Sequence, residues 1–168
     1  MKNKTTLLAT MVILAASLSR LLPHPPNFTA IGAMAFFSGC YVLDRRFAFL
    51  IPMGVMFVTD LLIGFHTGMI PVYLCVAFTA FLGLRLSGKP TFSSGLTSVL
   101  VGSLAFFLIT NLPIFYPSLY PNTLEGLLQS YTAALPFFRN QLAGDLIYTG
   151  LLFLVFNLLK NKVLNLAN

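Results

Sequence analysis

Six long apolar runs dominate the sequence and leave little of the chain outside them. They cover approximately residues 5–22, 29–43, 47–64, 69–86, 95–115 and 138–159, and the breaks between them are rich in Pro, Gly, Asn and charge. Because a helix needs about 20 mainly apolar residues to cross a bilayer, the runs predict about six transmembrane helices. We therefore expect an all-α membrane protein with a single transmembrane domain over residues 1–168 and no appended soluble domain.

The scarcity of charge supports the bilayer as the main solvent. Only 8% of the residues are charged, against about 25% in a typical soluble domain. The formal net charge of +6 could indicate nucleic-acid binding. The basic residues, however, are scattered in ones and twos between apolar runs instead of forming a patch, so we expect no nucleic-acid partner.

The positions of the basic residues predict the topology. Eight of the ten Lys and Arg residues lie at the two chain ends and in every second connection between the runs: Lys2, Lys4, Arg45, Arg46, Arg85, Lys89, Lys160 and Lys162. Only Arg20 and Arg139 lie near the remaining connections, which alternate with these along the chain. Since cytoplasmic loops carry the excess of Lys and Arg, both termini are predicted inside. The first run also fits a cleavable secretory signal, and the later runs keep their orientation in either case.

The outer connection between residues 116 and 138 is long and patterned. Pro117 and Pro121 disfavour a helix, whereas Asn122 and Thr123 can cap a new one. Leucines and a tyrosine then recur at helical spacing, which predicts a short amphipathic helix near 123–135 on the outer surface. This helix could seal the bundle at the interface or form a lid over a substrate site.

The few ionisable residues inside or at the ends of the runs all fall in the predicted outer half. They are Arg20, Asp60, Arg139 and Asp145. Charges in membrane spans are costly and usually pair with one another or face a wet cavity. The four could therefore form ion pairs that fix helix contacts, or together line a polar pocket open to the outside.

Two histidines and a cysteine add possible ligands to the same half. His24 lies in a proline-stiffened loop with Asn27, and His66 lies in the next outer turn. Cys75 lies in the outer half of the fourth run, and a thiolate can bind a transition metal. The spacing is not that of a known metal motif, so hydrogen bonding to the backbone and buried packing remain alternatives. Tyr73 could bring a hydroxyl to an apolar cavity.

Sequence motifs of enzymes are missing from the chain. There is no Walker motif, G-x-S-x-G, H-E-x-x-H or dinucleotide fingerprint. We expect neither an enzyme nor an intrinsic cofactor.

Three motifs carry a resemblance over nearly the whole chain: Arg20…Pro23-His24-Pro25-Pro26-Asn27-Phe28, Asp60…Gly64-Phe65-His66…Val72-Tyr73 and Leu135-Pro136-Phe137-Phe138-Arg139-Asn140…Gly144-Asp145. With them the chain resembles a family of small bacterial membrane transport proteins. That family is similar to the substrate-binding S components of energy-coupling-factor (ECF) transporters, and in particular to the cobalamin-specific BtuM type. The resemblance implies a six-helix S-component-like bundle in the bacterial inner membrane that captures a vitamin at its outer face.

The resemblance also implies roles for individual residues. Cys75 would be the ligand to the cobalt of a corrinoid, and His24, Asp60, Tyr73 and Arg139 would surround the corrin amides. Asn27, His66 and Asp145 complete the predicted set of substrate-binding residues, because they share the polar outer half with them. Cobalamin would be a transported ligand, and an ECF energising module a possible partner. The small-residue docking patch of many S components has its nearest equivalent in Ala15-x-x-x-Ser19, near the opposite, outer end.

We therefore expect a substrate-capture protein for a vitamin-like nutrient, with cobalamin or a related corrinoid first. Another vitamin or a transition-metal ion is an alternative substrate. A structural or assembly protein of the membrane is the alternative function.

Overall fold

The structure is a computed structural model that describes the backbone of residues 2–87 and 89–165 and the side chains of residues 4–87 and 89–162. Within this part of the chain every regular element is a helix. The order is α1 (Lys2–Ser17), η1 (Leu18–Arg20), α2 (Ile31–Tyr41), α3 (Arg45–Ile63), α4 (Met69–Leu86), α5 (Phe92–Thr110), η2 (Pro113–Phe115) and α6 (Leu124–Asn165). The predicted all-α class is confirmed.

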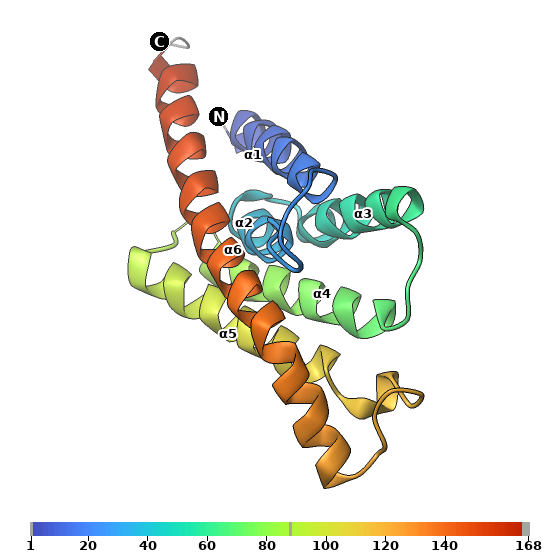
Figure 1. The fold of residues 1–168 in the computed structure, drawn as a ribbon. Coiled ribbons are helices and arrows are strands. Elements are labelled where there is room, and N and C mark those ends of the chain that lie inside the picture. The colour runs from blue at the N-terminus through green and yellow to red at the C-terminus, as the bar shows by residue number, and fades with distance from the viewer. Residues whose placement is uncertain (1, 88, 166–168) are drawn as a thin grey trace.

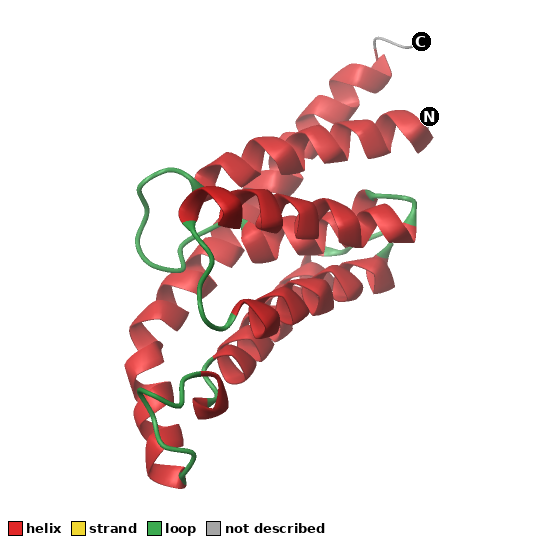
Figure 2. Ribbon diagram, turned by 90° about the vertical axis from the view of Figure 1, so that its right-hand side faces the viewer, coloured by secondary structure: helices red, strands yellow, loops and turns green. Residues whose placement is uncertain are grey.

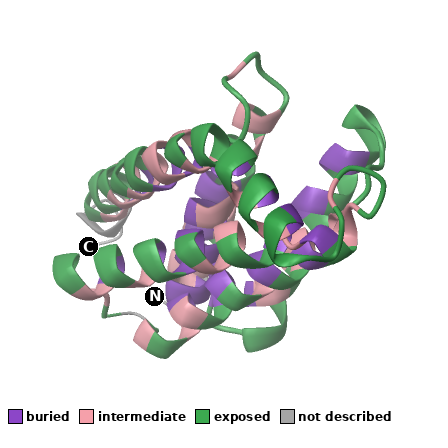
Figure 3. Cartoon of the chain, turned by 60° about the horizontal axis from the view of Figure 1, so that its bottom comes forward, coloured by how far each residue is buried: buried purple, intermediate pink, exposed green. Residues whose placement is uncertain are grey.

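Helix α2 forms the centre of the bundle and packs against all the other α-helices (Figure 1). Every residue from Ala33 to Cys40 is buried. Its apolar and small side chains point in all directions, as expected for a helix surrounded by protein. Figure 3 shows the buried residues gathered in the middle of the bundle and the outward faces exposed.

Helices α2 and α4 approach each other closely because glycines face each other across their contact. A Cβ placed on Gly39 would lie 2.1 Å from the carbonyl oxygen of Ala80, and one on Gly83 would lie 2.1 Å from that of Phe36. Small residues allow helix backbones to come together in this way in membrane proteins. The close position of α4 on the central helix therefore requires glycine, which has no side chain, at both positions.

A proline inside α3 leaves a buried carbonyl group that α2 satisfies. Pro52 has no N–H and cannot bond the carbonyl of Ala48, four residues earlier. Ser38 on α2 donates its hydroxyl to this carbonyl oxygen at 2.9 Å. The hydrogen bond that proline removes from α3 is thus replaced by one between helices.

Four helices are long and apolar enough to cross a membrane: α3, α4, α5 and residues 124–162 of α6. Large apolar side chains such as Leu62, Ile70 and Leu154 are exposed on them, as expected where lipid covers the surface. Helix α2 has 11 residues and measures about 16 Å, roughly half the hydrocarbon core. The structure thus shows several apolar helices that are compatible with a multi-pass membrane protein. The number of six complete spans stays a prediction.

The separate outer helix predicted near 123–135 is wrong. These residues begin α6, a single helix of 42 residues that continues through Pro136, so the last helix does not start near 138. Figures 1 and 2 show its first turns, and the loop before them, extending beyond the other helices. Thr123 caps this helix by accepting from the amide of Gly126 at 3.2 Å, which confirms the predicted cap.

Contacts with the C-terminal end of α5 and its C-cap Asn111 explain why the helix continues through its proline. Ser130 donates to the carbonyl of Asn111 at 2.6 Å, and Tyr131 donates to that of Leu108 at 2.7 Å. Both residues lie before Pro136, so the first turns of α6 are held in place from outside. Proline costs a helix about 3 kcal/mol, and such tertiary contacts offset part of this cost.

The other predicted boundaries differ by a few residues. The first run ends as α-helix at Ser17 instead of residue 22, the second is shortened to Ile31–Tyr41, and the fifth ends at Thr110 instead of 115. In Figure 1 the first turn of α1, the last turns of α6 and the start of α5 lie toward one side, and the α3–α4 loop lies toward the other. The alternation of helix ends agrees with the predicted parity, and which end faces the cytoplasm remains a prediction.

Candidate functional site

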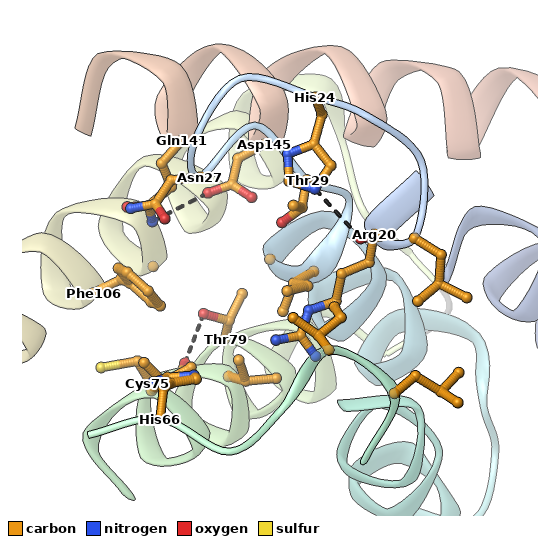
Figure 4. A pocket seen from close by; sticks show the side chains of 18 residues that line it. Arg20, His24, Asn27, Thr29, His66, Cys75, Thr79, Phe106, Gln141 and Asp145 are labelled. Carbon is orange, nitrogen blue, oxygen red and sulfur yellow. Dashed lines mark hydrogen bonds between the residues drawn. The ribbon is translucent and has the colours of Figure 1, made fainter. Parts of the chain in front are cut away.

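A cavity of about 540 Å³ lies between the helices at the end formed by the α1–α2 and α3–α4 loops. Residues of α2, α3, α4, α5 and α6 surround it, together with η1 and the α1–α2 and α3–α4 connections. Figure 4 shows its polar side chains: Arg20, His24, Asn27, Thr29, His66, Cys75, Thr79, Gln141 and Asp145. Apolar residues, including Ile31, Val76 and Phe106, complete the wall.

Arg20 lies on this wall and is held by α3. Its guanidinium forms an ion pair with Asp60, at 2.5 Å between Nη2 and Oδ1, and donates to the hydroxyl of Thr59 and the carbonyl of Met56. Tyr73 on α4 donates to the second carboxylate oxygen of Asp60 at 2.7 Å. Asp60 is fully buried. The network joins η1, α3 and α4 and balances the charge of Arg20.

The α1–α2 loop covers the cavity with a defined turn. Asn27 has a positive φ of 63°, and the amide of Phe28 donates to the carbonyl of Pro25 at 2.9 Å. A turn with proline second and a left-handed residue third is typical of type II, and asparagine tolerates that conformation. Asn140 on α6 donates to the carbonyl of Pro26 at 3.1 Å and ties the turn to the bundle.

His24 is half-buried in this loop and lies against backbone oxygens. Its Nδ1 is 2.9 Å from the carbonyl oxygen of Pro25, and its Nε2 is 3.4 Å from that of Arg20. Because only a nitrogen that carries a proton can donate, the tautomer decides which of these contacts is a hydrogen bond. The imidazole is thus positioned at the mouth of the cavity by its own loop.

The α3–α4 loop brings His66 to the other side of the mouth. The His66 ring is exposed, with Nδ1 2.8 Å from the carbonyl oxygen of Thr67. Next to it, Tyr116 lies over Gly68, where a Cβ would come within 2.7 Å of the phenol oxygen. Burial raises the pKa of Tyr116, so the phenol stays neutral in this contact.

Asp145 on α6 lies at the first turn of the central helix. Its carboxylate accepts from Ser103 at 2.7 Å, from Gln141 at 3.5 Å and from the backbone amide of Ala33. A Cβ on Gly32 would lie 2.3 Å from its Oδ1. The N-cap position of α2 has no side-chain cap of its own, so Asp145 supplies a cap and a favourable charge from another helix.

Cys75 lines the deep part of the cavity and is nearly fully buried. Its thiol lies 4.0 Å from the carbonyl oxygen of Ala105, and it is not part of a disulfide. Among the residues that the structure describes, no group of three or more His, Cys, Asp and Glu side chains is arranged to hold a metal ion. A metal bound to Cys75 would therefore have to bring its remaining ligands with it.

The structure brings together most of the predicted site residues. The cavity is lined by His24, Asn27, His66, Cys75 and Asp145, and by Arg20. Asp60 and Tyr73 lie behind Arg20 and do not line it. Arg139 is exposed on α6 and lies outside the cavity. Asp60 and Tyr73 therefore form part of the wall's support and Arg139 part of the surface, and a role of these three residues in binding substrate stays a prediction.

Several lining residues were missed from the sequence. Gln141 precedes Asp145 by one helical turn, and this spacing could have indicated it. Thr29, Thr79 and Phe106 carry no comparable signal, because threonine and phenylalanine are common in membrane helices for packing alone.

Comparison with known proteins assigns the chain to a family without assigning a function. Residues 1–166 match a family described as a family of unknown function, DUF6580. The chain belongs to this family. No curated protein and no solved structure matches the chain significantly. Membership in DUF6580 therefore brings no substrate or partner, and the cavity is the main guide to function.

Proposed function

We propose that the protein is a membrane substrate-capture component of nutrient uptake, which binds a vitamin-sized molecule in the cavity and passes it inward. The observation that carries the proposal is the cavity of about 540 Å³ with a mixed polar and apolar wall. Pockets for small ligands typically measure about 300–1,000 Å³ and combine apolar walls with a few placed polar groups. Its location, at the end opposite most basic residues, corresponds to the predicted outer face.

The loops around the cavity suit capture from that face. The turn that contains Asn27 and the α3–α4 loop that contains His66 form its mouth, and Cys75, Val76 and Thr79 of α4 line it deeper in the bundle. A ligand entering between the loops would meet Arg20, His24 and His66 first and Asp145 on the α6 side. Release to the cytoplasm would require rearrangement of the bundle or the action of a partner, such as an ECF energising module.

Cobalamin or a related corrinoid is the substrate that the sequence resemblance suggests, with Cys75 on the cobalt. A corrinoid with its nucleotide tail is larger than this cavity, and Cys75 is only 1% exposed. Corrinoid binding would therefore require the mouth loops to separate. A smaller vitamin fits the cavity without that change and is the better substrate for the observed geometry.

Purification from bacterial membranes tests the proposal. The protein is extracted in mild detergent, its bound small molecules are released and identified by mass spectrometry, and its absorption spectrum is recorded with and without added corrinoid. We expect a vitamin-sized compound in stoichiometric amount, and a cobalt-corrin band altered by Cys75→Ala if the substrate is a corrinoid. Cys40→Ala is the matched control, since Cys40 is buried outside the cavity.

A structural or assembly role is the second candidate, and the Arg20–Asp60–Tyr73 network favours it because this network joins helices. It would be supported if no small molecule is retained or bound at micromolar concentration and if changes in the cavity alter only stability. Reporter fusions at both termini, read out in the bacterial inner membrane, test the proposed topology. Cytoplasmic reporter activity at both ends is expected.

A further inference from the structure

Asp145 is a carboxylate on the cavity wall without a cationic partner. The only ion pair among the residues with described side chains is Arg20–Asp60. Asp145 is 4% exposed, and neither its neighbours nor the rest of the described cavity wall offers it a Lys, Arg or His within ion-pair distance. Charges in a membrane interior are costly, and those that persist are usually paired or functional.

The groups that do hold Asp145 are neutral. A serine hydroxyl, a glutamine amide and a backbone amide donate to it, and the N-terminal end of α2 contributes a partial positive charge. These groups orient the carboxylate without cancelling its charge. Asp60 differs, because the guanidinium of Arg20 lies 2.5 Å away and neutralises it.

The charged side chains of the cavity therefore leave one unbalanced negative charge. Arg20 lines the cavity but is balanced by Asp60 behind it, whereas Asp145 lines the cavity and is balanced by nothing on the wall. Figure 4 shows Asp145 and Gln141 on one side of the cavity and Arg20 on the other. A ligand with a positively charged nitrogen would complete the missing ion pair.

We propose that the cavity recognises a small organic cation whose ammonium or similar nitrogen forms an ion pair with Asp145, and this inference rests on the proposed capture function. Asn27 and Gln141 can accept or donate hydrogen bonds beside the charged group. Ile31, Val76 and Phe106 provide an apolar surface for the rest of the molecule. The aromatic face of Phe106 also suits a cation, since aromatic rings attract positive charge.

A matched pair of probes tests the charge preference without knowledge of the natural substrate. Benzylammonium and benzyl alcohol have nearly the same shape and differ mainly in charge at neutral pH. Both are titrated into the full-length protein in detergent, and binding is followed by calorimetry. We expect benzylammonium to bind at least about tenfold more tightly, and Asp145→Asn to abolish this preference.

The variants are chosen to separate charge from folding. Asparagine keeps the size of the side chain and one acceptor oxygen, which can still accept from the amide of Ala33, whereas its NH2 group replaces the second carboxylate oxygen. Asp44→Asn is the matched control, because Asp44 caps α3 outside the cavity by accepting from the amide of Arg46 at 2.8 Å. It should leave the preference unchanged. If Asp145→Asn fails to fold, the comparison of the two probes on the wild-type protein still shows whether the cavity prefers a cation.

Equal binding of the two probes, binding of neither, or an unchanged preference in Asp145→Asn would overturn the inference. Its failure is distinguishable from failure of the proposed function. A co-purified neutral or anionic vitamin with no preference for benzylammonium would leave capture intact and refute the cationic substrate. A preference for benzylammonium without any retained or bound nutrient would instead identify a cation site in a protein that does not capture nutrients.

Discussion

The contact between α2 and α4 yields the sharpest stability prediction. In Gly83→Ala the new methyl group would start 2.1 Å from the carbonyl oxygen of Phe36. Carbon and carbonyl oxygen in close helix contacts are normally separated by about 3.3 Å. The two helices would have to move apart locally by about 1 Å, because both partners are backbone and no side-chain rotation relieves the overlap.

The cost follows from the contacts that such a movement loosens. A gap of about 0.5–1 Å loses a quarter to a half of the dispersion energy of each affected atom pair. Since α2 is buried along its length in the bundle, we expect Gly83→Ala to lower the free energy of unfolding by about 2–3 kcal/mol, at the upper end of typical overpacking costs. Gly39→Ala should do the same, because its methyl group would meet the carbonyl of Ala80 at 2.1 Å.

Two other glycines provide matched controls. A Cβ on Gly54 in α3 or Gly150 in α6 meets no atom within 4 Å. There alanine should be neutral or stabilise the helix by up to about 1 kcal/mol, because glycine is a poor helix former. Reversible unfolding in mixed micelles, followed by circular dichroism, measures all four variants. If Gly83→Ala is as stable as Gly54→Ala, the close approach of α2 and α4 is refuted.

Two further predictions concern buried polar groups. Ser38→Ala leaves the carbonyl of Ala48 without a donor and should lower the free energy of unfolding by about 1–3 kcal/mol. Adding Pro52→Ala supplies an amide within α3 and should recover most of this loss. No recovery would contradict the hydrogen bond between Ser38 and Ala48. Arg20→Met leaves Asp60 buried without its partner and should cost about 3–5 kcal/mol. Adding Asp60→Leu should restore much of the stability in the same unfolding measurement, and a double variant as unstable as Arg20→Met would show that the pair is not the cause.

The sequence was a good guide to the bundle because its signal is compositional. Long apolar runs separated by polar breaks indicate helices without reference to any partner, and each α-helix of the described residues overlaps one of the predicted runs. Thr123 was also recognisable as a cap, since capping depends on residues three apart in the chain. The sequence predicted a break in the helix near Pro136, where the structure has continuous helix. The hydrogen bonds that hold Ser130 and Tyr131 at the end of α5 are tertiary contacts, and the sequence does not reveal them.

The same distinction applies to the site. That polar residues gather in one half of the bundle follows from their positions along alternating helices, and the sequence alone determined it. Which of them face the cavity was decided only by the tertiary structure. Asp60 turns to Arg20 and is neutralised there, whereas Asp145 meets only neutral donors at the first turn of α2. The reason is that a side chain's partner depends on helix rotation and packing, which single-chain periodicity does not specify.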